Sequence, residues 1–256
     1  MWFDASLHPG CLAARDVQDL AFFRVEGALV LPDMPASASA AAVRQGWEAG
    51  AAAARRLRGA GLAAVAAAGL GPRAIPLRGL EALLADLPHA LDWPEVGALG
   101  VVGLEAGGEL EERVLLRQLE LARELRLPLV AAASGRGREK LTRRLLALLR
   151  ESELEPGRAL VLGADALTVK AIRACGHLAV LPLSGGGARR DPIDAAVALV
   201  RALGAEGIAL GSDAGLAGGD LLALPRAADR LARSGLSAPV VRRVCGGNAR
   251  AFLGLR

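Results

Sequence analysis

VGALGVVGLEAGGELEERVLLRQLELARELRLPLVAAAS, residues 96–134, is the stretch that decides the fold of this chain. Apolar runs over 96–104 and 127–134 flank a segment, 110–126, whose apolar residues recur with the 3.6-residue period of an amphipathic helix. The side of that helix expected to be apolar carries Val114, Leu115, Gln118, Leu121, Ala122 and Leu125. Near-continuous apolarity is typical of parallel strands buried on both faces, so the stretch predicts a strand–helix–strand unit of a parallel sheet.

The same alternation continues along all 256 residues. The expected strands cover residues 2–6, 28–33, 62–69, 96–104, 127–134, 159–165, 178–184 and 207–213. Most intervals between them have room for a helix, and residues 35–61 predict a long one that begins after Ser37 or Ser39. Eight such strands in about 250 residues are typical of a (β/α)8 barrel. We therefore predict a single-domain α/β barrel over residues 1–256, without an internal linker.

Composition limits the location and the partners that we expect. No apolar run reaches the roughly 18 residues of a membrane span, and the N-terminus lacks the basic and apolar segments of a secretory signal, so we expect a soluble cytoplasmic protein. Cys11, Cys175 and Cys245 form no C-x-x-C pair, which favours buried thiols over disulfides or structural zinc. The net charge is +4, but 3% aromatic residues offer few rings for base stacking, which disfavours nucleic acid.

The sequence Ser6-Leu7-His8 stands at the end of the first expected strand, where a metal-binding barrel would carry His-x-His. Alternate strand residues point to the same side, so two such histidines can bind one ion. The chain resembles the TatD-like metal-dependent hydrolases of the amidohydrolase superfamily. The matching segments are FDASLH (3–8), VGALGVVGLE (96–105), QLELARELRLPLVAAA (118–133), RALVLGADALTVKAIRACGHLAV (158–180), ALGSDAG (209–215) and VVRRVCGGNARAFLG (240–254). This resemblance implies a barrel with its site at the C-terminal ends of the strands.

The resemblance also implies six metal-ligand positions. They fall on Ser6 and His8 in the first strand, Val101 in the fourth, Ala132 in the fifth, Gly163 in the sixth and Asp213 in the eighth. Only His8 and Asp213 keep a side chain that can bind a metal, while zinc normally takes three or four protein ligands. We therefore expect that the two-metal centre of the family is largely lost.

Other residues could supply a smaller site. The polar residues expected near the strand ends are Asp4, Ser6, His8, Glu105, Asp165 and Asp213, and a hard ion such as magnesium accepts a few carboxylates plus water. We expect His89 in a solvated connection between a helix and a strand, and His177 at the start of the seventh strand, away from the site. A structural role remains open for the two retained ligands: Asp213 could cap the turn at Ala214-Gly215, and His8 could cover the barrel mouth.

Glycine and arginine are concentrated in the loops that follow the later strands. Residues 184–191, SGGGARRD, contain Arg189 and Arg190, and residues 134–140, SGRGREK, contain Arg136 and Arg138. Glycine backbone N–H groups and bidentate guanidinium groups both bind anions, and many barrels hold phosphate after the seventh and eighth strands. These loops predict an anion site at the mouth, with a solvated surface loop as the alternative.

Two functional hypotheses remain. The first is a pseudoenzyme, in which the TatD-like barrel binds a small anionic ligand or a protein partner without catalysis and without a cofactor. The alternative is a metal-dependent hydrolase of phosphoester or amide bonds, with one divalent ion at His8 and Asp213 and with Asp213 accepting a proton from the bound water. We expect no membrane association under either hypothesis.

Overall fold

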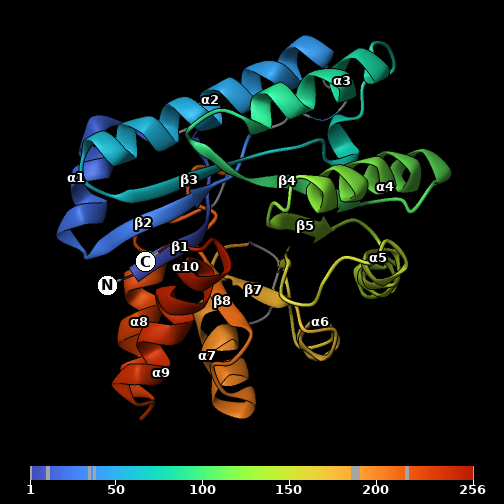
Figure 1. The fold of residues 1–256 in the computed structure, drawn as a ribbon. Helices are drawn as coiled ribbons and strands as arrows, with labels where there is room; N and C mark the ends of the chain where they lie inside the picture. Colours follow the sequence, from blue (N-terminus) through green and yellow to red (C-terminus); the bar gives the residue numbers. More distant parts are fainter. Residues whose placement is uncertain are drawn as a thin grey trace.

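Eight parallel strands form one sheet in the computed structural model of the chain, which describes residues 2–9, 12–33, 36, 39–185, 191–216 and 219–255. The strands are β1 (Trp2–Leu7), β2 (Val25–Val30), β3 (Ala63–Ala68), β4 (Val96–Leu104), β5 (Leu129–Ala133), β6 (Ala159–Leu162), β7 (Leu178–Pro182) and β8 (Ile208–Gly211). They are hydrogen-bonded in chain order, so residues that follow consecutive strands become neighbours at one end of the sheet (Figure 1).

Contacts between the first and the last strand close the sheet into a barrel. The backbone N–H of Asp213 donates to the Ser6 carbonyl over 2.9 Å, and the N–H of His8 donates to the Ala214 carbonyl over 2.7 Å. A parallel bridge between Leu7 and Ala214 continues this pairing. The predicted (β/α)8 barrel is therefore confirmed.

Helices follow the strands and surround the sheet (Figure 1). The helices are α1 (Ala14–Phe22), α2 (Ala40–Gly59), α3 (Leu80–Leu91), α4 (Glu109–Glu124), α5 (Arg138–Glu151), α6 (Val169–Ala174), α7 (Pro192–Leu203), α8 (Ala223–Arg233), α9 (Ala238–Arg242) and α10 (Asn248–Phe252), with short turns η2 (Pro72–Ala74) and η3 (Arg243–Gly247). Ser39 begins α2, and its side chain accepts a hydrogen bond from the Ala42 N–H, as expected for a cap; Ser37 lies outside the described residues.

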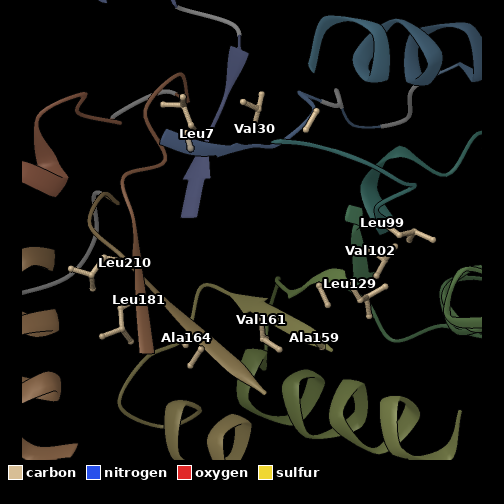
Figure 2. Packing of buried hydrophobic residues seen from close by; sticks show 14 of the residues in the cluster. Leu7, Val30, Leu99, Val102, Leu129, Ala159, Val161, Ala164, Leu181 and Leu210 are labelled. Atoms are coloured by element: carbon tan, nitrogen blue, oxygen red, sulfur yellow. The ribbon is translucent and has the colours of Figure 1, made fainter. Parts of the chain in front are cut away.

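Side chains of the strands alternate between two hydrophobic clusters. In β6, Ala159 and Val161 belong to the larger cluster, which joins the strands to the helices, whereas Leu160 and Leu162 contact the smaller cluster inside the barrel. Figure 2 shows members of the larger cluster pointing outward from the strands. The smaller cluster also contacts Phe252 and Leu253 at the C-terminus, so the last helix packs against the barrel interior. Burial on both faces explains why the strands are nearly continuous apolar runs.

Some local expectations need correction. In α4 the buried residues include Leu119, whereas Leu121 is half-buried and Leu125 is 42% exposed, because the helix ends at Glu124. His89 lies in the last turn of α3 and not in a connection, and it is exposed as expected. Cys245 is buried as expected, but Cys175 is exposed, and both are free thiols; Cys11 lies outside the described residues. No helix in the described part of the chain is long and apolar enough to cross a membrane.

Candidate functional site

A cavity of about 840 Å³ opens at the C-terminal ends of the strands. Its lining comes from β1, β4, β5 and β6, from residues that follow β1, β2, β5, β6 and β8, and from the start of α5. The six positions implied by the resemblance, Ser6, His8, Val101, Ala132, Gly163 and Asp213, all line it. The structure therefore brings these positions together at the end where barrel enzymes carry their active sites.

Asp213 is held by two hydroxyl groups. Ser6 Oγ donates to its Oδ1 over 2.5 Å, and Ser184 Oγ donates to its Oδ2 over 2.9 Å. The residue adopts a left-handed backbone conformation with φ +52°, which turns the chain sharply after β8. Asp213 does not cap the Ala214 N–H, because that N–H donates to Ser212 Oγ. Both carboxylate oxygens thus already accept hydrogen bonds from the protein.

His8 is 8% exposed and contacts a carboxylate that the sequence analysis did not single out. Its Nδ1 lies 2.9 Å from Asp33 Oδ1. Asp33 follows β2, the neighbour of β1, so the two side chains come from adjacent strand ends. Strand order was the available signal for this pair, since Asp33 is the last residue of the expected strand 28–33.

Asp4 lies in the middle of β1 and is 1% exposed. Its Oδ1 accepts from the backbone N–H groups of Ser6 and Ser212, each over 3.0 Å, and its Oδ2 accepts from Ser212 Oγ. Burial raises the pKa of Asp4 to about 6, although these three hydrogen bonds favour the ionised form. Asp4 is therefore a buried link between β1 and the end of β8, and it does not line the cavity.

The remaining acidic candidates, Glu105 and Asp165, line different pockets. Glu105 pairs with Arg73 over 2.6 Å and lines a neighbouring pocket. Asp165 lines the main cavity, and its Oδ2 accepts a hydrogen bond from Arg138. Burial raises the pKa of the Asp165 carboxyl, but the Thr168 hydroxyl and the Arg138 guanidinium lower it more, so the net pKa lies below the usual range.

The predicted anion-binding arginines have different positions. Arg138 lines the cavity, whereas Arg136 is exposed and lies outside the lining. Arg189 and Arg190 lie outside the described residues, so the structure places neither. His177 precedes β7, at the other end of the strand from the cavity; burial lowers its pKa, and its Nδ1 has no hydrogen-bond partner among the described residues.

These residues do not fit the metal centre that the resemblance implies. His8 and Asp213 are the two metal-binding side chains at the six positions, and both Asp213 oxygens accept serine hydroxyls. Throughout the described ranges, no group of three or more His, Cys, Asp or Glu side chains is arranged to hold an ion. Structural and catalytic zinc sites use three or four protein ligands.

No protein-family model and no curated protein sequence matches this chain. Solved structures do match it. A TatD-like protein from Archaeoglobus fulgidus has 24% identity and a TM-score of 0.78, covering 99% of this chain and 100% of its own. A TatD homologue from Escherichia coli has 18% identity and a TM-score of 0.72, covering 100% and 98%. The phosphotriesterase homology protein from Escherichia coli, solved with phosphate in its active site, has 18% identity and a TM-score of 0.71, covering 98% of each chain. The chain thus has the barrel fold that these TatD-like and phosphotriesterase-type proteins share.

Proposed function

We propose that this barrel binds a small anionic ligand in its mouth without a metal ion and without hydrolysis. One observation carries the proposal: Asp213, the retained carboxylate of the implied metal centre, is held by the hydroxyl groups of Ser6 and Ser184. A hydroxyl that donates to a carboxylate replaces part of the charge compensation that a cation would supply. At Val101, Ala132 and Gly163 the cavity lining offers no metal ligand.

Arg138 supports the anionic character of the ligand. The Arg138 guanidinium donates a hydrogen bond to Asp165 Oδ2. The Asp165 carboxylate is itself held by the Thr168 hydroxyl, which donates over 2.8 Å, and by the Leu167 N–H, which donates over 3.0 Å. A guanidinium has five N–H donors, so an Arg138 anchored in this way can still bind a phosphate or carboxylate. The anchored arginine has also lost part of its conformational freedom before a ligand arrives, which lowers the entropic cost of binding.

Metal content tests the first half of the proposal. The purified protein should contain well under one equivalent of zinc, manganese or nickel, and its melting temperature should not change in EDTA. An ion that binds only the folded state stabilises it by mass action, so chelation of a resident ion would lower the melting temperature. One tightly bound ion per chain, with a melting temperature that falls in EDTA, would instead support the single-metal hydrolase at His8 and Asp213.

Thermal-shift screening against phosphorylated and carboxylate metabolites tests the second half. An anion should stabilise the wild type, and the response should fall in Arg138→Ala and in the double variant Arg189→Ala/Arg190→Ala. Arg150→Ala is the matched control, because Arg150 is exposed in the last turn of the same helix and does not line the cavity. If no anion stabilises the wild type, or if all variants respond equally, the anion proposal fails and a protein partner becomes the better hypothesis.

A further inference from the structure

The contact between His8 and Asp33 determines which nitrogen of the His8 ring carries the proton. An ionised carboxylate accepts hydrogen bonds but cannot donate them. A neutral imidazole whose Nδ1 lies 2.9 Å from Asp33 Oδ1 therefore carries its proton on Nδ1. Its Nε2 is then unprotonated and is an acceptor. Asp33 does not line the cavity but His8 does, and within the described part of the chain Nε2 makes no hydrogen bond.

The groups beside His8 are also acceptors. The hydrogen of the Ser6 hydroxyl is donated to Asp213, which leaves the Ser6 oxygen lone pairs for a ligand. Asp213 is half-buried, and a carboxylate has about four acceptor positions, of which two are used here. His8, Ser6 and Asp213 therefore form an acceptor side of the cavity, at the ends of β1 and β8.

Arg138 lies across the cavity from this acceptor side. It follows β5, and its partner Asp165 follows β6, whereas β1 and β8 are adjacent where the barrel closes. In a ring of eight strands in chain order, β5 is opposite β1. The two sides differ in chemistry: the first offers acceptors, and the second carries the Arg138 guanidinium, which is a donor, beside the carboxylates of Asp165 and Glu139.

We propose that the ligand is an anion that also carries hydroxyl or amine donors, with its acidic group at Arg138 and an O–H or N–H donated to His8 Nε2. The assignment of the acidic group rests on the proposed function, whereas the acceptor side does not. Asp33 is a positioning residue, because it touches His8 and fixes the tautomer that the ligand meets. Hydroxyalkyl phosphates and amino acids have this combination of groups.

Long-range ¹H–¹⁵N NMR of histidine-labelled protein tests the tautomer directly, because the chain has only three histidines. At about pH 8, where an ordinary imidazole is neutral, the His8 signals should show a protonated Nδ1 and a bare Nε2. In Asp33→Ala the ring should lose this preference, while the signals of exposed His89 should not move. Addition of EDTA should leave the wild-type spectrum unchanged. A wild-type His8 protonated on Nε2, or a tautomer indifferent to Asp33→Ala, would overturn the inference.

Two matched phosphates test the ligand class. Glycerol 3-phosphate carries hydroxyl groups and n-propyl phosphate does not, so calorimetry should show the first binding about tenfold more tightly to the wild type. In His8→Phe the two affinities should become similar, and in Arg138→Ala both should fall. Equal affinities in the wild type would overturn the acceptor role of His8 while leaving the anion proposal standing. If neither phosphate binds although the tautomer is as described, the anionic ligand, and with it the proposed function, is wrong.

Discussion

Replacing Asp4 by asparagine should remove a pH-dependent term from the stability of the barrel. The folded-state pKa of about 6 lies above the ordinary value of 3.8, because the carboxyl is buried. The folded protein therefore binds more protons than the unfolded chain between these two values, so the contribution of Asp4 is present at low pH and is lost as pH rises through about 6. A shift of this size corresponds to about 3 kcal/mol when it is fully expressed.

Asparagine suits the site because its carbonyl oxygen can accept from the Ser6 and Ser212 N–H groups, while its amide can donate to Ser212 Oγ. Urea unfolding of both proteins should be followed from about pH 4 to about pH 7.5. The free energy of unfolding of the wild type, minus that of Asp4→Asn, should fall by about 2.5 kcal/mol over this range, since Asp4 in the unfolded chain is already partly ionised at the lower limit. Acidic groups that do not interact with Asp4, such as Asp191, cancel in the difference because both proteins contain them; Asp213, whose charge contributes to the raised pKa of Asp4, is part of the measured effect. A difference that stays constant with pH would refute the reasoning.

Three further experiments test the barrel frame and the implied metal positions. Gln118→Leu should destabilise the protein by about 2 to 4 kcal/mol in urea unfolding, because buried Gln118 both accepts from the Leu70 N–H over 2.8 Å and donates to the Leu70 carbonyl over 3.0 Å. Gly103→Ala should cost about 3 kcal/mol or more, since its Cβ would lie 1.7 Å from the Ala132 carbonyl oxygen; Gly163→Ala, at φ +69° with nothing within 4 Å of its Cβ, is the control and should cost about 1 to 2 kcal/mol. The combined variant Ser6→His, Val101→Glu, Ala132→His and Gly163→His should take up more zinc, measured by elemental analysis, than any single change, and no gain in a folded quadruple variant would contradict the assignment of these positions.

The fold could be predicted because its signals are local. Each buried parallel strand is an apolar run, and each helix has its own period, so the order of elements follows from the sequence without knowledge of contacts. Boundaries depend on single residues. Strand β2 begins at Val25 rather than at residue 28. Val25 and Gly27 both pair with β1, although Glu26, at an irregularity in the register between them, interrupts the apolar run. Strand β6 ends at Leu162, because Gly163 adopts φ +69° and turns the chain out of the sheet.

The site was less predictable, because its contacts join residues that are distant in the sequence. The resemblance supplied His8 and Asp213, but nothing local to Asp33 or Ser184 marks them as partners of those residues. Each partner nevertheless follows a strand adjacent to the strand of the residue it contacts, β2 beside β1 and β7 beside β8. Once eight strands in chain order are predicted, polar residues that follow consecutive strands are expected to meet. This rule would have found both contacts.

The same neighbour relation explains how the mouth can be ordered without an ion. A metal bound at the six implied positions would connect β1, β4, β5, β6 and β8 across the cavity. In this chain, four contacts connect the ends of adjacent strands. They join Ser6 to Asp213, Ser184 to Asp213, His8 to Asp33, and Arg138 to Asp165. Hydrogen bonds to charged groups contribute about 1.5 to 3 kcal/mol where water is excluded, and about 0 to 1 kcal/mol at a half-exposed pair such as Arg138–Asp165. Together these contacts can hold the rim. The interior of the mouth, lined by Val101, Ala132 and Gly163, then remains open for a ligand.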